Sequence, residues 1–171
     1  EMADGVVVTT PRLQEVYGGV VVPNGIPSTY LDISRPKNEL ITVGYVGHVA
    51  THPDDLQVTH GAVNQALAST KGLSRFLALA DQKILVNLGI REREPHGWLP
   101  GVHLTKYAEF VSQLDIGIVP LTMEPFNQAK SWLKALEYAS LGVAPVVSPT
   151  YDNMRMVEAG AAVATHGPGD W

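Results

Sequence analysis

The chain has 171 residues, 45% of them hydrophobic and 17% charged, and its formal net charge is −5. Such a chain is long enough to bury the core of one domain, and its composition is that of a folded α/β protein rather than a disordered one. The acidic balance, without any long cluster of Lys or Arg, disfavours nucleic-acid binding, and the lack of cysteine excludes disulfides, thiolate metal sites and a cysteine nucleophile.

The first half of the chain alternates short apolar runs with helical patterns. The β-branched run Gly5–Thr10 predicts a strand, and Pro11, suited to the first helical position, begins a helix that ends at Gly18. Further expected elements are the strand Val20–Val22, a loop over residues 24–38, the strand Ile41–Val46 and a helix from Asp54 to Ser69. The segment after Arg75 predicts a strand to Ala80 and a short helix to Leu88, with a continuous helix as the alternative.

The second half continues this alternation. A helix over Thr105–Gln113, capped by Thr105, is expected to turn Tyr107, Phe110 and Val111 toward the core, with Tyr107 as a packing residue. The remaining expected elements are the strands Ile116–Val119, Ala144–Val147 and Ala161–Thr165 and the helices Ala129–Leu141 and Tyr151–Ala159. This alternation predicts a parallel sheet with helices on both faces.

The segment Leu114–Pro149 forms a strand–helix–strand pattern with polar residues at its helix. In such units ligands bind at the carboxyl ends of the strands, where the helix N-terminus attracts anions. Lys130 and Ser131 are expected at that N-terminus. Lys134 and Glu137 follow Lys130 at i+4 and i+7, so one helix face spanning about 10 Å could contact an extended ligand. The alternative is a solvated polar face.

A glycine turn follows the strand Ile41–Val46. Glycine allows a ligand or another backbone to approach closely, so Gly47 and His48 are expected to contact ligand. Asp55 lies in the first helical turn, where a carboxylate complements the helix dipole, and we assign it a structural or capping role. His52 is a further candidate for a phosphate contact.

Four segments, in the same order, resemble parts of one enzyme family. They are Ala3–Pro11 (A-D-G-V-V-V-T-T-P), Val20–Pro27 (V-V-V-P-N-G-I-P), Ile41–Leu56 (with G-Y-V-G-H-V-A-T-H-P-D-D-L) and Phe126–Pro149 (with F-N-x-x-K-S-x-x-K-x-L-E-Y-A-x-L-G). Together they resemble the C-terminal donor-binding domain of GT-B-fold glycosyltransferases, most closely the retaining, glycogen-synthase-like group of bacteria and phages. The resemblance covers nearly the whole chain, and four motifs in order are hard to explain by chance.

The resemblance implies a Rossmann-like α/β domain that binds a UDP- or GDP-linked sugar. The sugar would pass to an unidentified acceptor, with retention and without a metal ion or other cofactor. It implies that Lys130 and Ser131 hold the diphosphate, that Glu137 holds the ribose, and that Trp98 lies near the base, the alternative for Trp98 being an aromatic side chain packed on a loop. The residues expected to contact the donor are Gly47, His48, Trp98, Glu124, Asn127, Lys130, Ser131 and Glu137, with His52 as a further candidate.

The chain departs from the family pattern at two places. Where the E-x7-E element has its first glutamate, eight residues before Glu137, this chain has Ala129. Glu124 lies thirteen residues before Glu137, and its contribution to sugar binding stays open. The family's Arg and Lys pair near the glycine turn is also absent, and His48 and His52 are nearby instead.

The resemblance further implies a longer parent enzyme. We therefore expect these residues to be a fragment that lacks an acceptor-binding N-terminal domain. No apolar run approaches the roughly 20 residues that span a bilayer, and no signal-peptide pattern is present, so we expect a cytoplasmic protein.

Other functional classes fit the residues less well. A zinc site at His48, His52 and Asp55 has plausible spacing but no second ligand cluster. A nicotinamide dehydrogenase needs a denser glycine fingerprint than Gly44-x-x-Gly47, and in a phospho-receiver an aspartate ends the strand directly. A non-catalytic Rossmann-like binding or assembly module stays open, because a fold does not determine a function.

Overall fold

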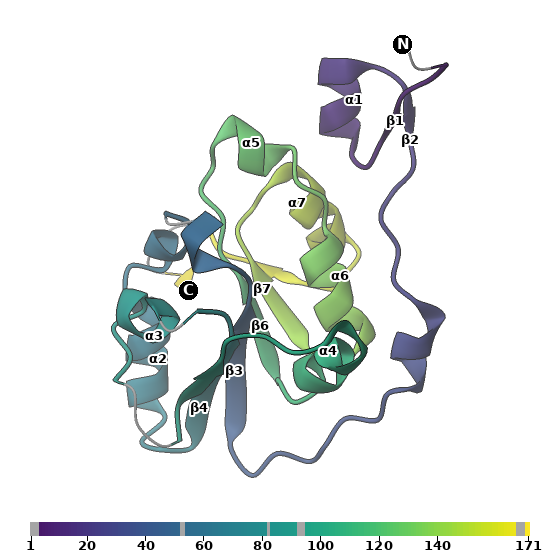
Figure 1. Cartoon of the computed structure of the whole chain (residues 1–171). Helices are drawn as coiled ribbons and strands as arrows, with labels where there is room; N and C mark the ends of the chain where they lie inside the picture. The colour runs from purple at the N-terminus through teal and green to yellow at the C-terminus, as the bar shows by residue number, and fades with distance from the viewer. Residues whose placement is uncertain (1–3, 52–53, 82, 92–94, 167–169) are drawn as a thin grey trace.

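A six-stranded parallel sheet organises the described part of the chain (Figure 1). The structure is a computed structural model, and it describes residues 4–51, 54–81, 83–91, 95–166 and 170–171. The strands of this sheet are β3 (Ile41–Val46), β4 (Ser74–Leu79), β5 (Gly97–Leu99), β6 (Ile116–Val119), β7 (Ala144–Val147) and β8 (Val163–Ala164). The predicted α/β class with a parallel sheet is confirmed.

The strand order is β5-β4-β3-β6-β7-β8. The chain moves outward from β3 through β4 to β5, then crosses back and moves outward on the other side through β6, β7 and β8. The direction therefore reverses between β3 and β6, which pair in parallel with Val43 opposite Ile116. In doubly wound sheets this reversal leaves a crevice at the carboxyl ends of the two central strands, where ligands bind.

Helices cover both faces of the sheet because alternate strand residues are apolar on each side. In β4, Phe76 and Ala78 pack under α2 (Ala62–Ser69) and α3 (Lys83–Asn87), whereas Leu77 and Leu79 face the opposite layer. That opposite layer consists of α4 (Leu104–Val111), α6 (Leu133–Ser140) and α7 (Tyr151–Glu158). Two separate apolar cores result, one on each side of the sheet. Figure 1 shows the helices that cover the two faces.

A small N-terminal unit precedes the sheet. Its strands β1 (Val7–Val8) and β2 (Val20–Val21) pair in parallel around α1 (Pro11–Tyr17), apart from the main sheet. The short helix η1 (Ser28–Asp32) lies on the connection from this unit to β3. Figure 1 shows the unit at one end of the molecule, joined to the sheet by an extended segment.

Most predicted elements are observed, several with the expected bounds, including α1, β3, β6 and β7. The segment after Arg75 is a strand followed by α3, so the continuous-helix alternative is wrong. The helix predicted over Asp54–Ser69 is also wrong: it is divided into η3 (Asp55–Thr59) and α2, because His60 and Gly61 adopt positive φ angles of 44° and 78°. The predicted Thr105 cap is wrong as well, since α4 is capped by His103.

The helix predicted from Ala129 begins only at Leu133. Two short helices, α5 (Pro125–Gln128) and α6, are separated by residues 129–132. The Thr10 hydroxyl donates to the Ala129 carbonyl at 3.0 Å, and the Trp132 N–H donates to Asp152 Oδ2 at 2.9 Å. These tertiary hydrogen bonds occupy backbone groups that a longer helix would use internally, so the helix starts four residues later than predicted.

Candidate functional site

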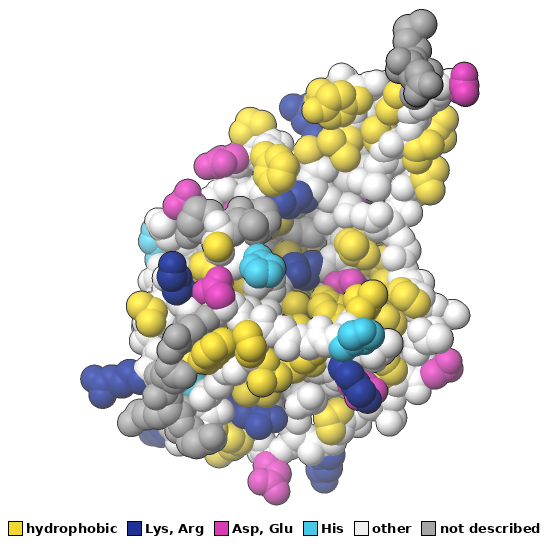
Figure 2. Space-filling model, viewed as in Figure 1, with side chains coloured by type: hydrophobic (Ala, Val, Ile, Leu, Met, Phe, Trp, Pro, Cys, Tyr) yellow, Lys and Arg dark blue, Asp and Glu magenta, His cyan; other side chains and the backbone are white. Residues whose placement is uncertain are grey.

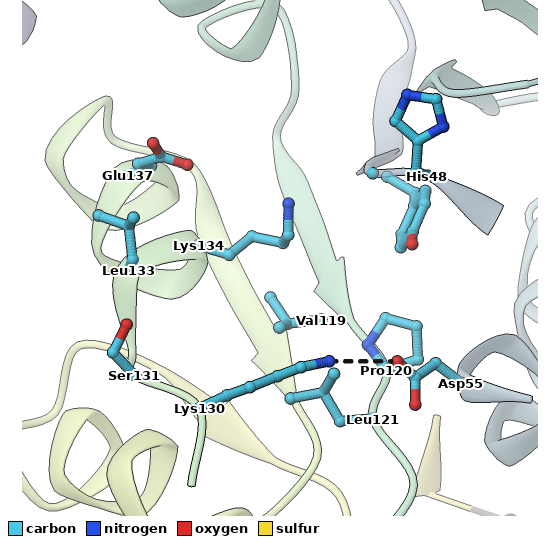
Figure 3. Close-up of a pocket in the computed structure, with 12 residues that line it drawn as sticks. His48, Asp55, Val119, Pro120, Leu121, Lys130, Ser131, Leu133, Lys134 and Glu137 are labelled. Carbon is cyan, nitrogen blue, oxygen red and sulfur yellow. Dashed lines mark ion pairs between the residues drawn. The ribbon is translucent and has the colours of Figure 1, made fainter. Parts of the chain in front are cut away.

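A pocket of about 380 Å³ lies where the strand order reverses. The ends of β3 and β6 form its floor, and the start of α6 forms one wall (Figure 3). Its lining residues are Tyr45, Gly47, His48, Asp55, Val119, Pro120, Leu121, Lys130, Ser131, Leu133, Lys134 and Glu137. The pocket therefore occupies the position at which a doubly wound fold binds its ligand.

Lys130 crosses the pocket toward Asp55. Its ammonium group lies 3.6 Å from Asp55 Oδ2, and Figure 3 shows the pair spanning the space between the α6 side and the η3 side. The same ammonium lies 5.1 Å from the centre of the Phe126 ring. Burial lowers the pKa of Lys130, and the Asp55 carboxylate opposes that shift. A bound anion would favour the charged lysine in the same way.

Asp55 is buried and accepts several hydrogen bonds. Its Oδ1 accepts from the Asn127 amide at 2.7 Å, from the Thr122 N–H at 2.9 Å and from the Thr122 hydroxyl at 3.3 Å. Only 5% of the residue is exposed. The predicted structural role of Asp55 is thus observed, but the contacts join distant segments rather than cap a local helix.

Lys134 brings a second ammonium group into the pocket. Its Nζ donates to the Val46 carbonyl at 2.5 Å, directly before the turn at Gly47 and His48. Burial lowers the pKa of Lys134, and the nearby Lys130 acts in the same direction although Glu137 opposes both. The second positive charge therefore comes from α6, whereas the family pattern has its Arg and Lys pair near the glycine turn.

Glu137 lies beyond Lys134 on α6, at the far end of this wall from Lys130 (Figure 3). The Tyr107 hydroxyl, from α4, donates to Glu137 Oε2 at 2.7 Å. Burial and the neighbouring Glu137 carboxylate raise the pKa of Tyr107, so its hydroxyl stays protonated and can donate. The next residue, Tyr138, is fully buried and its hydroxyl accepts the Val46 N–H at 3.1 Å.

Ser131 connects the pocket to the N-terminal segment. Its hydroxyl accepts a hydrogen bond from the Asn24 side chain at 2.7 Å, and the Asn24 carbonyl accepts from the Trp132 indole at 3.3 Å. The P-N-G turn of the sequence therefore contacts the candidate anion-binding segment directly. The carboxylate of Asp152, 1% exposed, holds the same segment from α7.

The structure brings five of the predicted donor-binding residues together in one pocket: Gly47, His48, Lys130, Ser131 and Glu137. Lys130 and Ser131 precede α6 rather than lying within its first turn, which corrects the predicted helix face. The space beside Gly47 is filled by Tyr45, because an added Cβ would lie 2.6 Å from the tyrosine hydroxyl.

Three other predicted residues lie outside the pocket lining. Glu124 is exposed before α5, and Asn127 is buried against Asp55. Trp98 is half-buried on β5 and packs against the core on the α2 and α3 side. Their contacts with a donor stay predictions, and His52 lies outside the described residues.

Four residues at the site make contacts that sequence reasoning does not predict. Lys134 was visible as part of the helix face, but its contact with the end of β3 was not. Asn24 belongs to a recognisable turn motif, yet no local spacing relates it to Ser131. Tyr107 is expected from the sequence to be a packing residue, and its hydrogen bond to Glu137 joins residues 30 positions apart. Tyr45 is part of an apolar strand in the sequence, and the structure places it in the pocket lining.

Within the described residues, no group of three or more His, Cys, Asp or Glu side chains is arranged to hold a metal ion. The same part of the chain contains no helix long and apolar enough to cross a membrane.

Comparison with known proteins identifies the fold. No protein-family model matches the chain, and no curated protein matches its sequence. Among solved structures, WaaG, a glycosyltransferase involved in lipopolysaccharide biosynthesis, matches 92% of this chain with a TM-score of 0.65 and 14% identity. The trehalose-6-phosphate synthase OtsA matches 90% with a TM-score of 0.57 and 14% identity.

A UDP-forming α,α-trehalose-phosphate synthase from Burkholderia vietnamiensis matches 83% of this chain with a TM-score of 0.54 and 14% identity. The chain spans 48% of the WaaG chain, 43% of the OtsA chain and 36% of the Burkholderia chain. The chain therefore has the Rossmann-like fold found in GT-B glycosyltransferases, and it spans half or less of the length of the proteins that share it.

Proposed function

We propose that this domain binds a nucleotide-sugar donor and serves in transferring the sugar to an acceptor. The observation that carries the proposal is the pocket between the ends of β3 and β6, into which Lys130, Lys134 and Glu137 point from the α6 side. Positive charge beside a carboxylate suits a ligand with a diphosphate at one end and a hydroxyl-bearing ring at the other.

Sugar transfer from such a donor leaves a nucleoside diphosphate, whose negative charge grows as the glycosidic bond breaks. Fixed positive groups lower the energy of that transition state without requiring a metal ion. We assign this stabilisation to Lys130 and Lys134, with the Ser131 hydroxyl as an additional donor. Glu137 would accept hydrogen bonds from the ribose hydroxyls. UDP or GDP as the carrier, metal independence and retention of configuration belong to this proposal.

We assign the acceptor to a second domain of a longer protein. One surface here suits such a neighbour: the unit formed by β1, α1 and β2 exposes Val6, Val7, Val16, Tyr17, Val20 and Val22. Figure 2 shows hydrophobic side chains gathered over this end of the molecule. Parallel sheets are normally covered on both faces, so this small sheet has an apolar side that a neighbouring domain would cover.

A thermal-shift screen with UDP, GDP, ADP, TDP and NAD, each with and without EDTA, tests the proposal. A ligand at 100 times its dissociation constant stabilises the folded state by about 2.7 kcal/mol, which is readily measured. We expect a selective shift with one nucleoside diphosphate that EDTA does not change. A folded sample that responds to none of them would contradict donor binding by this chain and favour a non-catalytic binding or assembly module.

A further inference from the structure

Tyr107 contacts the candidate ribose-binding carboxylate from outside the pocket. It lies on α4, none of whose residues is among the described residues that line the cavity, and its hydroxyl donates to Glu137 Oε2 at 2.7 Å. The Tyr107 ring packs in the apolar core between the sheet and the α4, α6 and α7 layer. Its position is therefore set by packing, independently of any ligand.

We propose that Tyr107 is a positioning residue that fixes the Glu137 carboxylate for recognition of the ribose 2′- and 3′-hydroxyls. The inference rests on the proposed function, in which Glu137 binds the ribose. It goes further by naming the residue that makes this carboxylate selective for a ribose ring over a deoxyribose ring.

The physical argument concerns the flexibility of glutamate. A free glutamate side chain has three rotatable bonds, and ordering it on binding a ligand costs affinity. Here the backbone and the carboxylate of Glu137 are ordered separately. The Tyr138 hydroxyl accepts the Val46 N–H, which holds the backbone of α6 against β3. The Tyr107 hydroxyl then fixes the carboxylate end, leaving Glu137 Oε1 as the oxygen that Tyr107 does not contact.

A ribose diol offers two adjacent donors, whereas a 2′-deoxyribose offers one. A carboxylate held in a single orientation can match both donors of the diol, and it loses a specific hydrogen bond when one of them is absent. A mobile carboxylate can reorient toward the remaining hydroxyl, so it discriminates less. Removing only the Tyr107 hydroxyl should therefore reduce selectivity more than overall binding.

The test is calorimetric titration of the full chain and its Tyr107→Phe variant with UDP and dUDP, and with GDP and dGDP. Tyr107→Phe keeps the packed ring and removes only the hydroxyl. For the wild-type chain we expect at least tenfold tighter binding of the ribonucleotide than of its deoxy form, the scale of one hydrogen bond to a charged group. In Tyr107→Phe we expect this ratio to fall to about threefold or less, with the affinity for inorganic pyrophosphate unchanged.

Two controls distinguish positioning from packing. Tyr17→Phe removes the hydroxyl of an exposed tyrosine on α1 and should leave the ratio unchanged. In a Glu137→Gln background, Tyr107→Phe should have no further effect on the ratio, because the residue acts through the carboxylate.

The possible failures are distinguishable. If the wild-type chain binds a ribonucleotide and Tyr107→Phe keeps the wild-type ratio, or weakens both nucleotides equally, the role of Tyr107 is wrong and the proposed function stands. If the wild-type chain binds no nucleoside diphosphate, the proposed function fails and the role of Tyr107 fails with it.

Discussion

Asp55 is the residue at which three segments around the pocket meet. It lies on η3, and it contacts the loop after β6 through Thr122, α5 through Asn127 and the linker between α5 and α6 through Lys130. A buried carboxylate is tolerated when donors and a positive charge compensate its desolvation. Once it is removed, those donors stay buried without their acceptor, which costs more than the loss of one ordinary hydrogen bond.

We therefore predict that Asp55→Ala destabilises the chain by about 3 kcal/mol, in the range measured for breaking a buried ion pair. The measurement is the free energy of unfolding by urea denaturation. Asp54→Ala is the matched control, because Asp54 is exposed and, among the described residues, its carboxylate accepts a hydrogen bond from the neighbouring Gln57 side chain. We expect it to change stability by about 0.5 kcal/mol or less. Equal losses in the two variants would contradict the anchoring role of Asp55.

Lys130 and Glu137 are predicted to act on different parts of the donor. Lys130→Ala should weaken nucleoside-diphosphate binding by more than about 1.5 kcal/mol, the scale of a lost charged hydrogen bond. Glu137→Ala should weaken nucleoside diphosphates but not inorganic pyrophosphate, which has no ribose. Calorimetric titrations with both ligands separate these effects. Lys106→Ala is the control, since Lys106 is an exposed lysine paired with Glu109 on α4.

An unchanged nucleotide affinity in Lys130→Ala would remove Lys130 from the site. Weakened pyrophosphate binding in Glu137→Ala would show that Glu137 does not act through the ribose.

At the scale of elements, the connection from η1 to β3 is fastened at the amino end of β6. Arg35 donates to the carbonyls of Gly142 and Leu114 and to Asp115 Oδ1, at 2.6, 2.7 and 2.8 Å. Asp115 Oδ2 accepts from the Asn38 amide at 2.9 Å and from the Thr42 N–H at 2.8 Å. These contacts tie the connection to the amino edge of the sheet, at the opposite end of β6 from the pocket.

These contacts of Asp115 predict that the stability of the folded chain falls at acidic pH. Burial alone would raise the pKa of Asp115, but the hydrogen bonds from Thr42, Asn38 and Arg35 outweigh it and lower the pKa. A lowered pKa means that the unfolded state binds the proton more readily than the folded state does. The stabilisation of the folded state by ionised Asp115 is therefore complete above the unfolded pKa of about 3.9, and it is lost as the pH falls further.

Urea denaturation at several pH values between 3 and 7 checks this prediction. We expect Asp115→Asn to lose less stability than the wild-type chain between pH 5 and pH 3, because its amide does not titrate. Parallel stability curves for the two proteins over that range would contradict the assignment.

At the scale of the whole molecule, the N-terminal unit and the main sheet differ in their packing. The unit has a two-stranded sheet, whereas the main sheet carries an apolar core on each face. Isolated two-stranded sheets are marginally stable in water. The contacts that connect the unit to the rest include Thr10 with Ala129 and Asn24 with Ser131 and Trp132.

We predict that native-state hydrogen exchange separates the two parts. The Val20 and Val22 amides, which bond to β1 and its flank, should exchange through local opening at lower free energy than the Val46 and Gly47 amides at the end of β3. Peptide-resolved exchange at several denaturant concentrations measures this difference. Equal protection in both parts would mean that the molecule opens as one cooperative unit.

Much of the main sheet was predictable because local sequence determines it. Apolar runs marked β3, β6 and β7, and Gly142, with a φ of 71°, marked the end of α6. The start of α6 was not predictable, because it depends on Thr10, which lies 119 positions from Ala129. The site residues also divide into those that local sequence identifies and those that depend on contacts between distant segments. Lys130, Ser131 and Glu137 lie in one motif, whereas the pairing of Asp55 with Asn127 joins residues 72 positions apart.

The separation of the Asp115 anchor from the pocket has a consequence for how this protein can change. The two lie at opposite ends of β6, whose four residues span about 13 Å at the usual rise per strand residue. Effects of substitutions at sites farther apart than about 10 Å and without shared partners usually add. Substitutions at the Asp115 anchor therefore change stability while leaving ligand preference intact. Stabilising substitutions there can compensate for pocket mutations that alter ligand preference and also lower stability.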